Sequence, residues 1–483
     1  MLPSAHFVMQ DDLVVYGGLI VKAAAAAAIA ASNQKKKTRP RGRFFHRRPR
    51  HSIHDVYTWM GESIFRCAFR MTYDSFWRLY DILFPHIITV MERSSRVYYH
   101  RRGGRCGGNH LPPPVRNGPI TLSMRLGMAL RYFAGGSSYD IMCVFCVSYS
   151  EVLKSVWIIV DAVNVCPEFL ISYPSSLEEQ RRIAAEFEAA STPKIRNCAG
   201  AIDGILIWIL KPSLKEAKSV GVDQRKFLCS RKHKFGLNCQ AVSDCRGRIL
   251  DISMKFGGSS SDCLAFEGSE LYRRLDNGLL LHDEGNDRFV LFGDNAYLNT
   301  PFMATPFTNV SGDANRAAED SYNFYHSQLR IRVECAFGML VQRWGILRTA
   351  MPRNIRIQKI TALVTALAKL HNFCISEADG VDGVPALLNR DTHYITNNIH
   401  GHVGLGNDNI HQNTVVPTDL MHLGEHFGDV TENILHYHRE QNRKIELPRT
   451  KLFNMIVDGH WERPTRLTDY DRRRRSSVNK TNT

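Results

Sequence analysis

The 483-residue chain lacks the cysteine pattern of a disulfide framework. Its twelve cysteines are scattered singly through apolar stretches, which suits reduced thiols that act as small hydrophobic side chains in a cytosolic or nuclear compartment. One C-x-x-C motif occurs, at Cys143 and Cys146, and no second pair follows at zinc-ligand spacing. The sequence therefore predicts neither a disulfide-stapled secreted domain nor a zinc finger.

Long hydrophobic runs are also scarce. Residues 13–31 form the one candidate, but this stretch contains Lys22 and a run of alanines, which drive membrane insertion poorly. It follows Asp11 and Asp12, whereas a signal peptide starts with positive charge. We interpret it as a helix or a low-complexity stretch, and we expect no membrane partner.

Acidic residues are missing from the two basic ends of the chain. Residues 35–50 carry nine Lys and Arg and no acid, and residues 471–483 carry a net charge of +4. Of the total charge of +15, only +2 remains for the rest of the chain. These ends are interpreted either as solvated disordered tails or as phosphate-binding arms and nuclear-import signals. The second interpretation predicts a nuclear protein. Arg41 and Arg43 lie in a Pro-Arg-Gly-Arg segment that resembles half of a minor-groove AT-hook.

Residues 51–170 have the apolar spacing of helices. A glycine- and proline-rich connector at 93–119 interrupts them and contains Arg101 and Arg102 but no acid, so it is a candidate contact for the DNA backbone. Residues 120–165 predict three short helices of the helix-turn-helix type. Lys154 is the one basic residue of the third helix, so a helical bundle packed on the next domain remains an equal alternative.

Residues 195–376 predict an α/β domain. Strands are expected at 199–210, 235–242, 249–256 and 288–292, with helices at 262–275 and 328–347. Three strands, a helix, a fourth strand and a later helix form the plan of the ribonuclease-H-like fold, a mixed sheet flanked by helices. Residues 377–483 are expected to form a helical extension with a basic tail.

Three acids interrupt or end these elements. Asp203 lies in the first strand, Asp294 follows the fourth, and Glu334 lies in the late helix. Since the first and fourth strands of this fold are neighbours, the three carboxylates should form a site for Mg²⁺ or Mn²⁺, with two ions that activate the attacking oxygen and stabilise the leaving oxygen. Asp262 is a further candidate ligand, although an N-cap role suits it better.

Each acid alone has an ordinary interpretation. Asp203 could belong to a turn, Asp294 could cap a strand end, and Glu334 could pair with Arg330 four residues earlier. Their order in one predicted fold favours a shared site instead. The basic cluster of Arg231, Lys232 and Lys234 is predicted either to contact phosphates or to be a solvated surface. Two histidines, His326 and His371, are expected to be buried and hydrogen-bonded rather than metal ligands.

Several motifs together resemble a known family. They are F-R-C-A-F-R-M at 65–71, A-I-D-G at 201–204, S-R-K-H-K-F-G-L-N-C-Q-A-V at 230–242, G-G-S-S-S-D at 257–262, G-D-N-A-Y at 293–297, Y-N-F-Y-H-S-Q-L-R-I-R-V-E-C-A-F-G at 322–338, R-W-G-I-L-R at 343–348 and L-H-N-F-C-I at 370–375. With these motifs the chain resembles the PIF/Harbinger-type DDE transposases and their relatives over residues 64–376. The family triad falls on Asp203, Asp294 and Glu334.

The resemblance implies an endonuclease that cuts DNA at transposon ends and inserts them at a target site with Mg²⁺ or Mn²⁺. It also implies a separate Myb-like protein that assists DNA binding, which suits the nearly neutral body of this chain. A homo-oligomer is a candidate assembly. The alternative is a domesticated or decayed derivative that binds DNA or protein without cutting.

Overall fold

The computed structural model describes residues 49–101, 119–281, 288–308, 316–353, 355–379 and 448–463, of which 94–101, 378 and 379 are described by their backbone alone. These residues fall almost entirely within one compact unit, Arg50–Thr483. The predictions for residues 13–31, Arg41, Arg43, Arg102 and the basic tract at 471–483 lie outside the described residues. Of the C-terminal extension, which was expected to be helical, α14 (Pro448–Asp458) is described.

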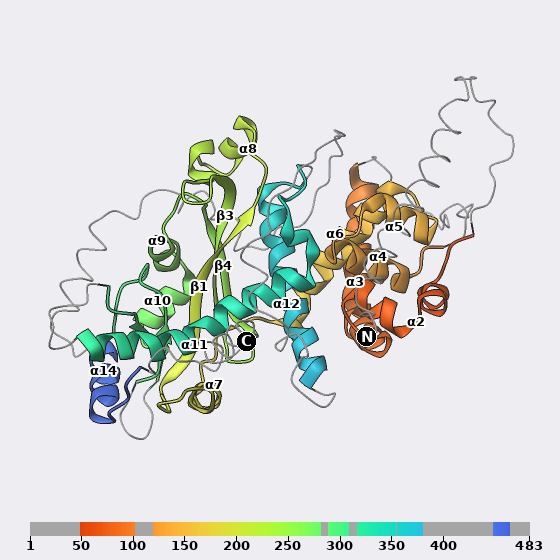
Figure 1. Cartoon of the computed structure of the whole chain (residues 1–483). Coiled ribbons are helices and arrows are strands. Elements are labelled where there is room, and N and C mark those ends of the chain that lie inside the picture. Colours follow the sequence, from red (N-terminus) through yellow and green to blue (C-terminus); the bar gives the residue numbers. More distant parts are fainter. Residues whose placement is uncertain are drawn as a thin grey trace, which may run out of the picture. The chain divides into compact units, whose positions relative to one another are not determined.

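The N-terminal part is helical, as expected (Figure 1). It comprises α2 (Ile53–Phe69), α3 (Tyr73–Arg101), α4 (Leu122–Phe133), α5 (Ser138–Phe145) and α6 (Tyr149–Val165). Serine side chains define the helix starts, because Ser137 accepts from the N–H of Tyr139 and Ser148 from that of Glu151. The three helices predicted at 120–165 are therefore present with the expected breaks.

The burial of α6 bears on the two interpretations of this region. Lys154 is exposed, but ten other α6 side chains, among them Trp157 and Ile159, are buried against the surrounding helices. A recognition helix needs an open face to enter a DNA groove. Because α6 instead packs on α3, α4 and α12 (Ile357–Asp379), the structure favours the helical-bundle alternative.

The sheet is mixed, as predicted, and β1 lies at its centre. It contains β1 (Cys198–Trp208), β2 (Leu228–Cys229), β3 (Lys234–Ser243), β4 (Ile249–Gly257), β5 (Val290–Phe292) and β6 (Met303–Ala304). The order is β2-β3-β1-β5-β6, and β4 also pairs with β3. Strand β1 runs antiparallel to β3 and parallel to β5, so the first and fourth predicted strands are neighbours.

Helices flank this sheet. The long α11 (Arg316–Arg343) packs on β1, β3 and β5, while α7 (Leu177–Ala190) packs on β1 and α9 (Asp262–Glu267) on β3 and β4. The remaining elements are α8 (Leu214–Ser219), α10 (Glu270–Asp276) and the short 3₁₀ helices η1 (Pro167–Phe169), η2 (Gln224–Phe227) and η3 (Gly345–Arg348).

Two predicted helix boundaries are wrong. The helix expected at 262–275 is instead two helices, α9 and α10. Gly268 lies between them and packs so closely on Phe256 that a Cβ there would lie 2.4 Å from its ring, and Ser269 is the N-cap of α10. The helix expected at 328–347 starts twelve residues earlier and ends at Arg343. Gly345 follows this end, where its Cα packs against α4 so closely that a Cβ would lie 2.5 Å from the carbonyl oxygen of Ala134.

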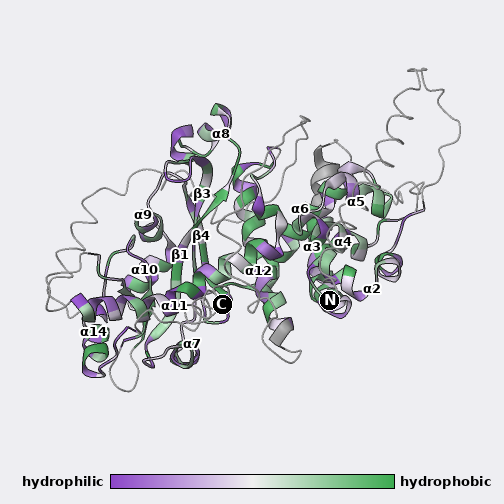
Figure 2. Ribbon diagram, viewed as in Figure 1, coloured by the Kyte–Doolittle hydropathy of each residue, from purple (hydrophilic) through white to green (hydrophobic). Residues whose placement is uncertain are grey.

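The buried apolar residues form two clusters. The first joins α2 to α6 with the Trp208 end of β1 and most of α12, and the second lies between α7, β1, β5 and α11. Figure 2 shows apolar residues prevailing along β1 and α12. Helix α12 contributes Leu363 and Leu367 to the first cluster and Ala368 to the second, so it supports both.

Among the described residues, no single helix has the length and hydrophobicity needed to cross a membrane. The bent pair of α5 and α6 passes that test together, with an angle of 102° between the two helices. Of the cysteines that the structure describes, all eleven are free thiols, in agreement with the expected absence of a disulfide framework.

Candidate active site

The pairing of β1 with β5 brings two of the acids together. Ala201 lies opposite Phe292, and Asp203 and Asp294 each follow that pair by two residues. Side chains two residues apart point to the same face of a sheet. The Phe292 ring stacks on His326 of α11 with 4.9 Å between ring centroids, so α11 covers this face.

Helix α11 adds the third acid and a cation. Nη2 of Arg330 lies 2.6 Å from Oε1 of Glu334, and Nη1 of Arg330 lies 3.6 Å from Oδ2 of Asp203. The side chain of Asp203 is 17% exposed and that of Glu334 is 46% exposed. The carboxylates therefore line the boundary between the core and solvent, where an ion and a substrate have access.

The charges of the three acids act on one another. Burial is the main cause that raises the pKa of Asp203 to about 6, from an ordinary value of 3.8. Asp294 and Glu334 raise this pKa further, whereas Arg330 and the N–H of Gly204, which donates to Oδ1 of Asp203 at 2.7 Å, oppose the rise. The structure therefore brings the predicted triad within electrostatic reach of Asp203.

The ligand atoms of the three acids do not all lie within 4.8 Å of one another, so the triad is not a preformed metal site. Among the described residues, a different group of side chains, that of His86, Cys166 and Glu168, is the one whose ligand atoms all lie within 4.8 Å of one another. The guanidinium of Arg330 contacts both Asp203 and Glu334, which keeps negative charges balanced in this arrangement. Beside Glu334, a Cβ at Gly338 would meet nothing within 4 Å, which leaves the open space expected there.

A hydrogen-bonded network backs the other face of β1. Asp262 Oδ1 accepts from the side-chain amides of Asn238 and Gln240, each at 3.0 Å, and the hydroxyl of Tyr297 donates to Gln240. A Cβ on Gly204 would lie 2.2 Å from Oδ1 of Asp262, so Asp262 fills the space that glycine leaves. Successive residues of a strand face opposite sides of the sheet. Asp262, which lies against Gly204, therefore contacts β1 on the side opposite to Asp203.

The N-cap role predicted for Asp262 is wrong. Ser261 is the N-cap of α9, and its hydroxyl accepts from the N–H of Leu264, while Asp262 is the first helical residue. Its carboxylate already accepts two amide hydrogen bonds on the face away from α11. The structure thus separates Asp262 from Arg330 and Glu334.

The predicted basic cluster forms the tip of a hairpin. Arg231 and Lys232 are exposed in the turn between β2 and β3, and the Lys234 ammonium lies 3.2 Å from the ring centroid of Trp208. Trp208 lies five residues beyond Asp203 on β1, about 17 Å at the usual rise of a strand. The cluster is therefore separate from the acids. One stretch of DNA backbone could contact both the acids and the cluster. The side chain of Arg101, at the end of α3, lies outside what is described.

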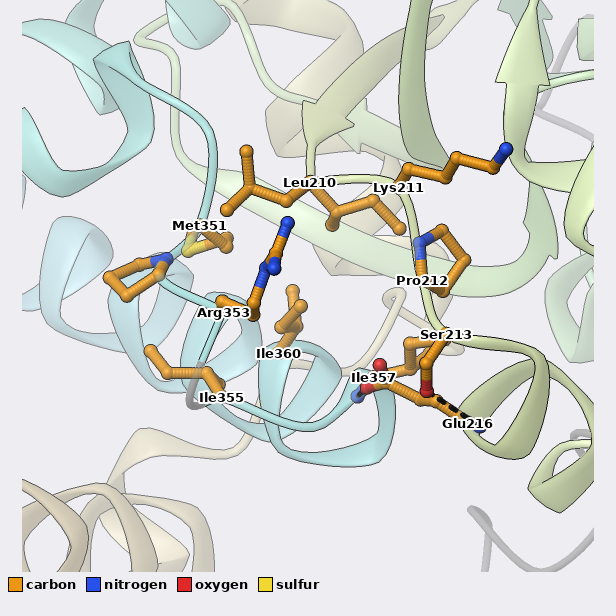
Figure 3. Close-up of a pocket in the computed structure, with 12 residues that line it drawn as sticks. Leu210, Lys211, Pro212, Ser213, Glu216, Met351, Arg353, Ile355, Ile357 and Ile360 are labelled. Carbon is orange, nitrogen blue, oxygen red and sulfur yellow. Dashed lines mark hydrogen bonds between the residues drawn. The ribbon is translucent and has the colours of Figure 1, made fainter. Parts of the chain in front are cut away.

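One cavity lies away from the acids. It encloses about 320 Å³ between the end of β1 and the start of α12, and Leu210, Lys211, Met351, Arg353 and Ile357 line it (Figure 3). Ile209, six residues beyond Asp203, contributes to the wall. This cavity is thus part of the interface between β1 and α12 and contains none of the triad.

Both histidines singled out from the sequence are buried and hydrogen-bonded, as predicted. His326 Nε2 lies 3.0 Å from the carbonyl oxygen of Ala304, and His371 Nε2 lies 3.0 Å from that of Gly247. Burial lowers their pKa values to about 4 and about 3. They therefore stay neutral at pH 7 and support the fold.

Sequence reasoning missed the residues behind β1. Asn238, Gln240 and Tyr297 join Asp262 in the hydrogen-bonded network on that face. Two polar residues separated by one position in the otherwise apolar strand 235–242 were the one signal in the sequence, since they must share one face. Their partner Asp262 becomes visible only through the pairing of β3 with β1.

A mixed α/β sheet with two strand carboxylates beside a helix carboxylate is the site architecture of the DDE nucleases. Residues 202–372, which contain all three acids, match the model of the family described as DDE superfamily endonuclease. Residues 202–372 are thus similar to DDE superfamily endonucleases, which supports the resemblance that the motifs indicate.

Curated relatives agree with this assignment. Proteins named "Putative nuclease HARBI1" from Bos taurus and Homo sapiens are each 24% identical to the chain, over 272 and 279 residues. These matches cover 56% and 57% of this chain and 71% and 73% of the relatives. No solved structure gives a significant match.

Proposed function

We propose that the chain is a metal-dependent DNA endonuclease and transposase. It hydrolyses phosphodiester bonds at transposon ends and joins those ends to target DNA, with Asp203, Asp294 and Glu334 as the metal ligands. The single observation that carries this proposal is the convergence of the three carboxylates: Arg330 contacts both Asp203 and Glu334, and Asp294 follows β5, which pairs with the strand of Asp203.

The residues present fit divalent Mg²⁺ or Mn²⁺. All three donors are carboxylates, which hard cations prefer, and Glu334 is partly open to solvent for waters and phosphate oxygens. Burial is the main cause that raises the pKa of Asp203, and repulsion from Asp294 and Glu334 adds to it; a bound cation would relieve that repulsion. When bound, two such ions would activate the attacking oxygen and stabilise the leaving one.

The chain's own residues prepare this site. With a pKa near 6, Asp203 is mostly ionised at pH 7 and can act as a ligand. The guanidinium of Arg330 contacts Asp203 and Glu334 and balances their negative charge. A bound cation would take over this role. The network of Asp262 and Gln240 fixes the strand beneath Asp203, which limits how far that carboxylate can shift.

DNA would meet the protein beyond the acids as well. The exposed Arg231 and Lys232 lie at the hairpin tip beyond Trp208, which is itself about 17 Å along the sheet from Asp203, so they are placed to contact a neighbouring stretch of backbone. The basic ends of the chain and a Myb-like partner would add affinity that the nearly neutral body lacks. Because these basic ends are also candidate nuclear-import signals, we propose that the protein is nuclear.

A second candidate function is an inactive derivative that binds DNA or protein without cutting. The contacts of Arg330 favour it, because they compensate Asp203 and Glu334 without any metal. Both candidates share the fold and differ in whether divalent cations displace Arg330 from the acids.

Cleavage of DNA separates the two. The full chain, with a Myb-like protein from the same genomic element where one exists, would be incubated with Mg²⁺ and a supercoiled plasmid that contains the inverted repeats flanking the gene. We expect nicking by the wild type and by Asp276→Asn, a surface carboxylate on α10. Asp294→Asn should lose it. Equal nicking by wild type and Asp294→Asn would refute the enzyme.

A further inference from the structure

A second group of metal-type ligands lies away from the acid triad. His86 comes from α3, and Cys166 and Glu168 come from the turn that follows α6. Their ligand atoms all lie within 4.8 Å of one another. Cys166 is buried, His86 has a side chain 23% exposed, and Glu168 is 58% exposed. The group therefore has a buried base and an open side towards solvent.

The separations of these atoms match those around a small tetrahedral ion. The Sγ atom of Cys166 lies 3.1 Å from Oε2 of Glu168, and Nε2 of His86 lies 3.6 Å from the same oxygen. Around tetrahedral zinc, bond lengths of about 2.0–2.3 Å place neighbouring ligand atoms about 3.3–3.5 Å apart. Two of the three separations thus differ from tetrahedral spacing by a few tenths of an ångström, and the third, between His86 and Cys166, is within 4.8 Å.

We propose that His86, Cys166 and Glu168 bind Zn²⁺. Thiolate, imidazole and carboxylate together form a donor set that zinc accepts and that Mg²⁺ does not favour. Three protein ligands leave a fourth position, which water can reach because Glu168 is exposed. The site does not depend on the proposed nuclease activity, since none of its residues belongs to the triad.

Binding would exchange hydrogen bonds for coordinate bonds. The Cys166 thiol now donates to Glu168. Zinc would replace the thiol proton, which leaves to solvent, while neutral His86 supplies its lone pair. Lys369 and Cys166 interact electrostatically, and Lys369 Nζ also donates to the carbonyl oxygens of Val163 and Asn164. Burial and the neighbouring Glu168 raise the pKa of the Cys166 thiol, so the ion itself would have to displace its proton.

The ion would clamp three elements together. His86 anchors α3, while Cys166 and Glu168 flank the start of η1, whose Phe169 packs on Phe373 of α12 with 5.8 Å between ring centroids. The segment after η1 leads to α7 and the sheet. A metal here would therefore link α3 to the segment that leads from α6 towards the domain that contains the acids.

Cobalt substitution tests this proposal directly. The purified full chain, freed of metal under reducing conditions, would be titrated with Co²⁺ and then Zn²⁺ in excess Mg²⁺, which occupies carboxylate sites. We expect one equivalent of Co²⁺ to give a thiolate-to-cobalt charge-transfer band that Zn²⁺ removes. Residues that merely orient a ligand change metal affinity by about 10- to 100-fold, so loss of a ligand should weaken binding at least as much.

Three variants define the outcome. Cys166→Ser should abolish the band, and Glu168→Gln, an exposed position that leaves packing intact, should weaken Zn²⁺ binding by at least about tenfold. Cys263→Ser is the matched control, because Cys263 also lies 3.4 Å from a carboxylate, that of Glu267, and belongs to no such group. A wild-type chain without the band, a band that survives Cys166→Ser, or unchanged zinc affinity in Glu168→Gln would each overturn the site.

Discussion

Replacing Asp203 with asparagine should stabilise the metal-free protein even though it removes a proposed metal ligand. Asparagine has nearly the shape of aspartate, and its Oδ1 can still accept the hydrogen bond that Gly204 donates. What disappears is a carboxylate whose ionised form is disfavoured by burial and by the neighbouring acids. A site assembled for a cation is expected to cost stability when the cation is missing.

The magnitude follows from the pKa shift. The folded pKa of about 6 lies above the ordinary value of 3.8, so the folded state binds the proton more tightly than the unfolded state. The stability that this provides is complete below pH 3.8 and is lost as the pH rises through 6. At 1.36 kcal/mol per pKa unit, the loss amounts to about 1.5 kcal/mol by pH 5 and about 3 kcal/mol by pH 7.5.

Urea denaturation of the full chain in EDTA would measure this effect. The free energy of unfolding of Asp203→Asn, relative to wild type, should rise by about 1.5 kcal/mol between pH 5 and pH 7.5. Asp276→Asn should show no such rise. Mg²⁺ should stabilise the wild type and have less effect on Asp203→Asn. A difference between Asp203→Asn and wild type that does not change with pH would refute the assigned environment of Asp203.

Three further predictions concern its surroundings. Arg330→Met should lower the free energy of unfolding at pH 7.5 in EDTA by about 1–3 kcal/mol, and Mg²⁺ should restore most of it; equal loss with and without Mg²⁺ would contradict this. Gly204→Ala should destabilise by about 1–3 kcal/mol in thermal melts, because its Cβ would meet Asp262. The control Gly338→Ala should be neutral or stabilising by up to about 1 kcal/mol. Arg231→Ala should reduce the salt slope of plasmid binding by about 1, and an unchanged slope would exclude a phosphate contact.

The order of the strands was accessible from sequence, and so was the choice of candidate acids. A carboxylate inside or just after an apolar strand is costly unless it has a function, so Asp203 and Asp294 stand out by their apolar neighbours alone. Their closeness follows once β1 and β5 are neighbours. The spacing of Arg330 and Glu334 likewise predicts their ion pair, which the structure contains.

The second contact of Arg330 was not accessible in the same way. Arg330 reaches Asp203 because α11 packs across β1 near Asp203. This contact depends on tertiary packing and not on spacing along the sequence. The early start of α11 has a similar cause. Its first half is covered by α14 and the residues after it, where Arg463 pairs with Asp320 and Tyr325 donates to the carbonyl oxygen of Glu462. Partners so distant in sequence leave no periodic signal.

Helix α12 has a consequence for how this protein can evolve. Its residues enter both apolar clusters, its Leu367 carbonyl accepts from the Trp344 indole, and its Lys369 holds the end of α6. A gene fusion that transplanted the helical part or the acid-bearing sheet alone would therefore have to carry α12 with it, and whichever half was left behind would lose its core. The two parts should be inherited as one piece, and new specificity should arise at the ends of the chain.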